Sequence, residues 1–349
     1  MKTSMAPAQQ IIINDHRRVT RMDNLRDSIS CRLRTDSAIV RELLAEFIGT
    51  FFLLLIGTAA NVQCVLGGGN VTSAHIAWGI GFAFAVFLAA NASGGHLNPA
   101  ISLTSFILGN LSFIRVLLYS AVQIIGAFCG AAITFVGHYD DISNYDHGIR
   151  AVAGANATAG LFATYPAPQM TLVGSLFDQI IGTAILSGMV CLITDRRQNI
   201  PNPMQPVLAG MVMTMIAMTY GSNGGFAINP ARDLGPRLFL LCVGYGWSVF
   251  SAYNYYFWIP IVGPTIGAVV GAWLYKLFIG LHGLDEQLDI STGPPYPKID
   301  KGYRVLDACD PETIQLFPVS QGLASPNPPS DYASVEKTLH RILKNHIFL

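Results

Sequence analysis

Six long apolar runs, separated by shorter polar or glycine-rich segments, make up most of the middle of the chain. A helix needs about 20 apolar residues to cross a hydrocarbon core of about 30 Å, and the runs match this length scale. They cover residues 43–65, 74–92, 116–136, 172–193, 207–220 (extended backward through Pro206) and 256–279. The pattern predicts an all-α membrane protein with six transmembrane helices.

Two further apolar segments are too short to cross a membrane, and each begins with the same tripeptide, Asn98-Pro99-Ala100 or Asn229-Pro230-Ala231. Asn is a favoured helix N-cap, and Pro fits the first helical position, where no N–H is needed. The residues that follow, 100–108 and 231–241, would span about 15 Å, half the hydrocarbon thickness. We therefore predict two re-entrant half-helices that meet N-terminus to N-terminus at the midplane and form a pore.

The two halves of the apolar body repeat one another. Glu46-Phe47-Ile48-Gly49-Thr50 in the first run is echoed by Gln179-Ile180-Ile181-Gly182-Thr183 in the fourth. Each half carries three spans, an odd number, so the second copy must be inverted relative to the first. We expect a channel domain over residues 41–280, with inverted halves at about 41–137 and 172–280.

The tails differ from this body. Residues 1–40 and 281–349 lack apolar periodicity, and Pro-rich stretches in the second of them are typical of disorder. Eight of the 21 Lys and Arg residues lie in positions 1–41, and the loop after the fourth run carries Arg196-Arg197. By the positive-inside rule we expect this loop and both termini in the cytosol, with the protein in the plasma membrane. This orientation places two glycosylation sequons, at Asn70 and Asn156, outside the cell.

Composition excludes several classes of function. The chain is 51% hydrophobic and 12% charged, with a mean hydropathy of +0.43, which is not a soluble composition. No basic stripe suggests nucleic acid as a partner, and no nucleophile–base pair suggests an enzyme. No metal-spaced cluster stands out, and no cofactor is expected.

The half-helices would place hydrogen-bond donors and positive potential at the centre of the pore. Each helix N-terminus carries unpaired N–H groups and about half an elementary charge. The oxygen of the capping Asn can accept from these groups, which leaves its NH2 free to donate to a passing hydroxyl or water. Such a site admits neutral polar solutes and opposes cations and protons.

Glycine-rich stretches precede both tripeptides. We expect an extended backbone there that aims carbonyls into the lumen, at Gly94-Gly95-His96 and at Gly225-Phe226-Ala227. Irregular backbone at this depth is tolerated only where it lines a water-filled cavity. The alternatives are that the glycines serve close packing alone, and that His96 contacts the solute instead of fixing the loop.

At these motifs the chain resembles the aquaporin family, over about residues 41–280. Residues 229–237 resemble the aquaglyceroporin branch, because water-selective members typically have a small residue where Asp233 stands, and Pro260-Ile261 is similar to the glycerol-conducting pattern. The resemblance implies a channel in the lipid bilayer for glycerol, water and small neutral solutes. It also implies a homotetramer with one pore per subunit.

The family's selectivity filter carries over by position to Trp78, Ala217, Phe226 and Arg232. Water-selective members usually have His where Ala217 stands, so the resemblance implies a wide filter. Trp78 and Phe226 would form an apolar corner for a carbon backbone. Arg232 would donate paired hydrogen bonds to hydroxyl groups.

Four more residues are expected to brace the pore loops. Glu46 resembles the family's buried glutamate that holds the re-entrant loop, and its repeat mate Gln179 stands where bacterial glycerol channels have Glu. We expect the neutral amide to serve the same role. Asp233 and Arg237 lie four residues apart on the second half-helix, where an ion pair would brace the outer mouth.

Three other functions remain open at this point: a water-dominant aquaporin, a secondary transporter of small polyols, and a purely structural role in membrane adhesion. A transporter also uses inverted repeats and broken helices. It would need intramembrane carboxylates for ion coupling, and the chain offers Glu46, Asp178 and Asp233.

Overall fold

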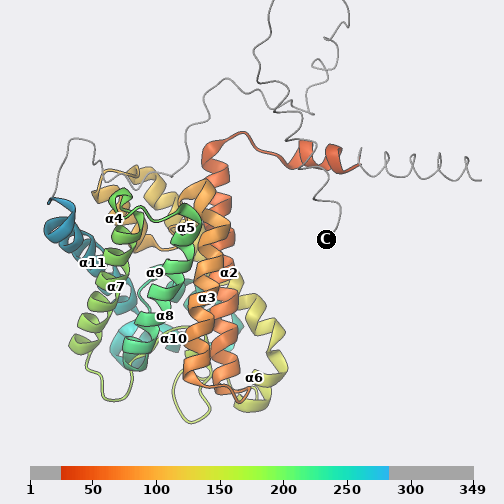
Figure 1. The fold of residues 1–349 in the computed structure, drawn as a ribbon. Helices are drawn as coiled ribbons and strands as arrows, with labels where there is room; N and C mark the ends of the chain where they lie inside the picture. The colour runs from red at the N-terminus through yellow and green to blue at the C-terminus, as the bar shows by residue number, and fades with distance from the viewer. Residues whose placement is uncertain (1–24, 283–349) are drawn as a thin grey trace, which may run out of the picture. The chain divides into compact units, whose positions relative to one another are not determined.

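The computed structural model describes residues 25–282 (Figure 1). Residues 25–33 are helical, so this part of the expected N-terminal tail is not irregular. The remaining tail predictions, for residues 1–24 and 283–349, lie outside the described residues. Residues 34–282 belong to a compact unit that is separate from residues 25–33, and this unit contains all the elements described below.

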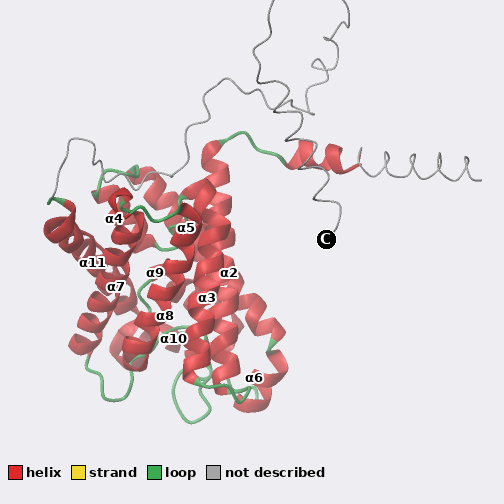
Figure 2. Cartoon of the chain, viewed as in Figure 1, coloured by secondary structure: helices red, strands yellow, loops and turns green. Residues whose placement is uncertain are grey.

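Within the described residues the structure consists of helices and turns without strands (Figure 2). Every predicted apolar run lies in a helix, which confirms the all-α fold. The helices are α2 (Ala38–Val65), α3 (Val71–Ser93), α4 (Pro99–Ile107), α5 (Phe113–Gly137), α6 (Tyr139–Asp146), α7 (Leu172–Thr194), α8 (Gln205–Gly224), α9 (Pro230–Leu240), α10 (Ser248–Tyr255) and α11 (Ile259–Tyr275). Short helical turns lie between several of them: η1 (Ala159–Leu161), η2 (Arg196–Gln198), η3 (Asn202–Met204), η4 (Leu241–Tyr245), η5 (Tyr256–Trp258) and η6 (Lys276–Gly280).

Among the described residues, five stretches are long and apolar enough to cross a membrane: α2, α3, α5, α7 and Ser248–Gly280, whose backbone leaves the helical conformation at residues 252–255. The fifth predicted run lies in α8, which has 20 residues but is not among these stretches. Its last turn, Gly221-Ser222-Asn223-Gly224, lowers its mean hydropathy. Because α8 packs against both α3 and α7, it is nevertheless an integral part of the bundle.

The two half-helices are present. α4 has 9 residues and α9 has 11, and each begins with Pro after an Asn N-cap. α4 contacts α5 and α11, whereas α9 contacts α5, α10 and α11, and the two half-helices contact each other. The predicted re-entrant pair is therefore confirmed as a pair of short helices inside the bundle.

Glycines allow the long helices to approach closely. A Cβ added at Gly126 or Gly130 of α5 would lie 2.5 Å from a backbone oxygen of α2. A Cβ added at Gly267 or Gly271 of α11 would likewise clash with a backbone oxygen of α7. The α2–α5 and α7–α11 pairs occupy matching places in the two halves, so the sequence repeat is also a repeat of packing.

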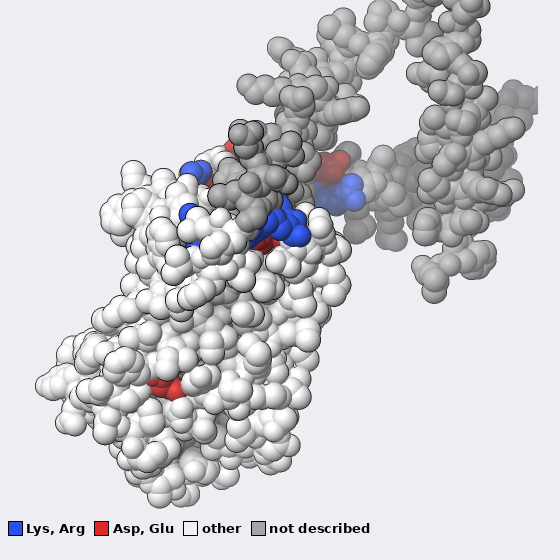
Figure 3. All heavy atoms as spheres, turned by 60° about the vertical axis from the view of Figure 1, so that its left-hand side comes forward, with Lys and Arg blue, Asp and Glu red and all other residues white. Residues whose placement is uncertain are grey.

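Charge is distributed unevenly between the two ends of the bundle (Figure 3). At the end where α2 and α5 begin, Arg115 Nε donates to a carboxylate oxygen of Glu42 at 2.8 Å. At the same end Arg197 pairs with Asp195, which follows α7. Hydrogen bonds from Arg197 lower the pKa of Asp195 to about 2. This carboxylate therefore stays ionised throughout the physiological pH range and keeps the loop after α7 in place.

Candidate functional site

The loops that precede the half-helices turn sharply through left-handed backbone. Gly94 and Gly95 have φ values of 93° and 66°, and Gly225 and Phe226 have 75° and 37°. The residue just before each capping Asn, Leu97 or Ile228, is also left-handed, with φ of 53° and 40°. The expectation of extended backbone was therefore wrong. Each loop must return the chain from a helix end to the bundle centre in few residues, and left-handed residues make that reversal possible.

The two capping asparagines bind each other's loops. Asn98 Oδ1 accepts from the N–H of Ala100 at 2.9 Å, and its Nδ2 donates to the carbonyl of Ile228 at 2.9 Å. Asn229 Oδ1 accepts from Ala231 N–H at 2.9 Å, and its Nδ2 donates to the carbonyl of Leu97 at 2.7 Å. The sequence predicts that these NH2 groups are free, but each of them already donates one hydrogen bond to the protein. One hydrogen of each fixes the opposite loop, and an amide NH2 has a second hydrogen to offer a solute.

Glu46 holds the first loop. It is fully buried on α2, and its carboxylate accepts from the backbone N–H groups of His96 at 2.9 Å and Leu97 at 2.7 Å. Gln123 of α5 donates to the same carboxylate at 2.8 Å. These contacts satisfy backbone N–H groups that the irregular loop cannot pair internally.

Gln179 meets the second loop in the corresponding way. Its Oε1 accepts from the N–H of Ile228 at 3.0 Å, and its Nε2 donates to Asp178 at 3.0 Å. Asp178 also accepts from Asn223 at 2.8 Å. A neutral amide at position 179 thus makes one loop contact, and the neighbouring Asp178 determines which end of the amide faces the loop.

The structure brings three of the four predicted filter residues into direct contact. The rings of Trp78 and Phe226 meet edge to face with their centroids 5.7 Å apart. The guanidinium carbon of Arg232 lies 4.7 Å from the centroid of the Trp78 ring. Ala217 of α8 is fully buried in the same apolar cluster as Trp78 and Phe226.

Arg232 is a buried cation with a fixed partner. Its Nη1 donates to the carbonyl of Phe162 at 2.9 Å, and its Nε has no hydrogen-bond partner among the described residues. Burial of a charge without pairing is costly, so the carbonyl and the Trp78 ring face are important to its stability.

Asp233 and Arg237 form the predicted ion pair, and it is completely buried. Asp233 accepts from the backbone N–H of Thr164 at 2.7 Å and from its hydroxyl at 2.6 Å. Arg237 donates to the carbonyl of Thr164 and to that of Val249, the latter at 2.6 Å. The pair therefore joins α9 to the long loop between α6 and α7 and to α10.

Sequence reasoning missed the role of this loop. Phe162 and Thr164 supply the backbone partners of Arg232 and Asp233, yet neither belongs to a recognisable motif. The available signal was the apolar run Leu161-Phe162-Ala163 inside a long loop, which the structure buries.

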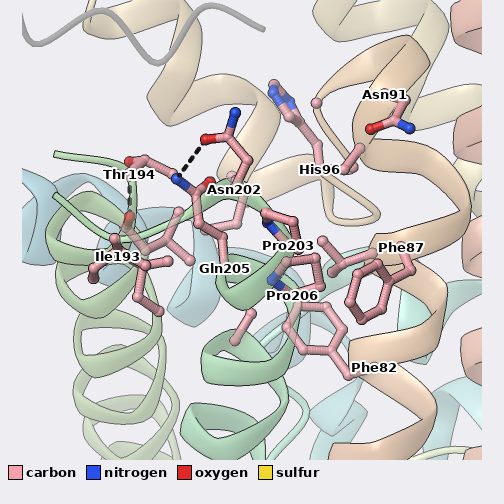
Figure 4. Close-up of a pocket in the computed structure, with 18 of the residues that line it drawn as sticks. Phe82, Phe87, Asn91, His96, Ile193, Thr194, Asn202, Pro203, Gln205 and Pro206 are labelled. Atoms are coloured by element: carbon pink, nitrogen blue, oxygen red, sulfur yellow. Dashed lines mark hydrogen bonds between the residues drawn. The ribbon is translucent and has the colours of Figure 1, made fainter. Parts of the chain in front are cut away.

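A cavity of about 900 Å³ adjoins the first capping asparagine, Asn98 (Figure 4). It reaches from Asn98 to the loop between α7 and α8, and Gly94, Gly95 and His96 line it. His96 Nδ1 lies 3.1 Å from the hydroxyl of Ser102, and its ring meets Tyr119 edge to face. Gly225 and Ala227, predicted to line the lumen in the second half, do not line this cavity; a Cβ at Gly225 would instead contact Thr164.

The two sequons differ in their surroundings. Asn70 caps α3, and its Oδ1 accepts from the N–H of Ser73 at 2.8 Å. Asn156 is exposed in the loop after α6, but the Thr158 hydroxyl of its sequon is buried and donates to Asp146 at 2.8 Å. Within residues 25–282, no group of three His, Cys, Asp or Glu residues is placed to hold a metal ion.

Comparison with known proteins identifies relatives that share most of this body. Residues 33–275 match the family model described as Major intrinsic protein. The chain is 40% identical to aquaporin-10 of Homo sapiens over 254 residues, 72% of this chain and 84% of that protein. It is 41% identical to aquaglyceroporin-2 of Rhizophagus irregularis over 240 residues, 67% of this chain and 76% of that protein. The X-ray structure of the aquaglyceroporin from Plasmodium falciparum matches with a TM-score of 0.64 at 30% identity, covering 70% of this chain and 98% of that one.

Proposed function

This chain belongs to the major intrinsic protein family, in its aquaglyceroporin branch, and we propose that it is a passive channel for glycerol, water and other small neutral solutes. The observation that carries this proposal is the pair of Asn-capped half-helices whose caps bind each other's loops. Their positive ends meet where the pore is narrow, which disfavours cations and protons without hindering neutral solutes.

The filter supports glycerol as a solute. Trp78 and Phe226 present apolar ring surface. Arg232 lies over the Trp78 ring and donates a hydrogen bond to the carbonyl of Phe162. A three-carbon polyol has an apolar edge of C–H groups and a polar edge of hydroxyls, so it matches a site with these two faces. Ala217 leaves the width that the carbon chain requires.

Transport should be passive. Three of the buried carboxylates, Glu46, Asp178 and Asp233, lie on α2, α7 and α9, and each accepts hydrogen bonds that hold a loop or a neighbouring side chain in place. An ion-coupled transporter would need one of them to exchange protons or sodium during transport. We expect glycerol flux into proteoliposomes to follow its gradient equally at pH 6 and pH 8, with or without sodium. Glycerol accumulation against its gradient, driven by an ion gradient, would favour the transporter.

Measurement of flux also separates the other candidate functions. Liposome swelling in glycerol and in water, with protein-free liposomes as the control, gives both permeabilities from one preparation. A water-dominant channel would pass water without glycerol. A purely structural membrane-adhesion protein would pass neither.

The protein should be a homotetramer in the plasma membrane with one pore in each subunit and both termini in the cytosol. The end of the bundle that carries Arg115 and Arg197 supports this orientation by the positive-inside rule. It places Asn70 and Asn156 outside, where glycosylation is possible. Native mass measurement in mild detergent should give four chains, and a single-chain species alone would contradict this.

A further inference from the structure

Trp78 is oriented by a residue outside every motif. Its indole Nε1–H donates to Oδ1 of Asn61 on α2 at 2.9 Å. The Nδ2 of Asn61 donates in turn to the carbonyl of Leu161, in the long loop between α6 and α7, at 2.9 Å. A single amide thus uses its acceptor for the filter tryptophan and its donor for the loop.

Tight packing around Trp78 restricts its indole ring to one position. Its side chain is almost fully buried, and a Cβ added at Gly57 of α2 would lie 2.4 Å from the indole. Arg232 lies over the ring, and Phe226 meets it edge to face. The Nε1–H bond to Asn61 selects the rotation of the ring within this space, because an indole has one N–H and no other polar atom.

Hydrogen bonds connect both Trp78 and Arg232 to residues 161–162, Trp78 through Asn61 and Arg232 directly. Asn61 binds the carbonyl of Leu161, and Arg232 binds the carbonyl of the next residue, Phe162. Consecutive peptide carbonyls are linked by rigid planar units. The separation between Trp78 and Arg232 is therefore set by a closed chain of contacts through Asn61 and this segment.

We propose that Asn61 is a specificity-determining positioning residue, which sets the width of the filter by holding Trp78 at a fixed distance from Arg232. It does not contact the solute and acts through these two residues. The inference rests on the proposed conduction of glycerol, and it adds that size selection among polyols depends on an amide of α2.

The test replaces Asn61 by Leu, which keeps the branching and the number of side-chain heavy atoms but removes both hydrogen-bonding groups. Proteoliposomes are assayed for water, glycerol and the four-carbon polyol erythritol. We expect the erythritol-to-glycerol permeability ratio to rise at least about threefold, in line with the loss of one or two hydrogen bonds that limit ring movement. Water permeability should stay within about twofold, because water fits the filter at either width. Asn61→Ala, which adds no new bulk, should shift the ratio in the same direction.

The matched control is Gln63→Leu, an amide-to-Leu change at an exposed position of the same helix. It should leave the ratio unchanged. A double-mutant cycle then separates positioning from general stability. Trp78→Phe lacks the N–H group, so adding Asn61→Leu to it should produce no further change in the ratio. If Asn61 had only a structural role, Asn61→Leu would lower the melting temperature equally in the wild-type and Trp78→Phe proteins. The erythritol-to-glycerol permeability ratio would then stay unchanged.

An unchanged ratio in folded Asn61→Leu and Asn61→Ala protein would overturn the inference, as would an additive effect in the double variant. The wild-type protein in the same assay tests the proposed function separately. Absence of glycerol flux there would refute the channel proposal, whereas normal wild-type flux with unaltered variants refutes the role of Asn61 alone.

Discussion

Replacing Ala217 by His should reduce glycerol permeability about tenfold or more while water permeability is largely kept. Ala217 is fully buried on α8 in the cluster that contains Trp78 and Phe226. An imidazole at this position would narrow the filter below the width that a carbon chain needs. It would also add a hydrogen-bond donor opposite the Trp78 and Phe226 rings. Water needs less width and accepts the new hydrogen bond, so its loss should be small. A tenfold change corresponds to about 1.4 kcal/mol at the narrowest point.

Stopped-flow measurement of both solutes on the same proteoliposomes checks this result. Added bulk in a packed site costs about 1–3 kcal/mol, so the folded yield is measured beside the flux. The control is Ala209→His, the same change on the same helix at a residue that lines the wide inner cavity. It should reduce glycerol flux much less. Equal losses of water and glycerol in well-folded Ala217→His protein, or an unaffected glycerol flux, would show that Ala217 does not line the filter.

Asp233→Asn should destabilise the protein by about 3–5 kcal/mol, the cost of breaking a buried ion pair by neutralising one partner. Asp233 is paired with Arg237 in a site where both side chains are at most 1% exposed. Asn keeps the size of Asp and can still accept from Thr164, so the change isolates the charge. It leaves Arg237 buried without its anion, with Arg232 next to Asp233 in sequence on the same half-helix.

The expected readout is a large fall in the melting temperature of the detergent-solubilised protein. Glu42→Gln provides the control, because it also neutralises a carboxylate paired with an arginine, but the side chains of Arg115 and Glu42 are 41% and 16% exposed. Solvent weakens a partly exposed pair, so this variant should lose less stability than Asp233→Asn and melt closer to the wild type. A similar melting temperature for the two variants would mean that the buried pair does not brace the outer mouth.

Much of the fold followed from local patterns in the sequence. Apolar runs predict membrane helices because a span must satisfy its own backbone hydrogen bonds. The two Asn-Pro-Ala tripeptides predict helix starts because the capping oxygen and the missing proline N–H act within one turn. The Asp233–Arg237 pair could also be predicted locally, because residues four apart share a helix face. α8 was the weakest of these predictions, because its polar last turn dilutes the apolar signal.

The sequence by itself thus determined the helices, their inverted repeat and the two caps, and its resemblance to a family predicted the filter residues. Only the tertiary structure decided how these parts hold one another. Asn98 and Asn229 each bind a carbonyl more than a hundred residues away, and Arg232 binds that of Phe162 across 70 residues. The acceptors are backbone atoms, which every residue type carries, so no side-chain pattern marks them. The left-handed φ of Leu97 and Ile228 is equally unmarked, because it is imposed by the packed bundle on residues that do not prefer it.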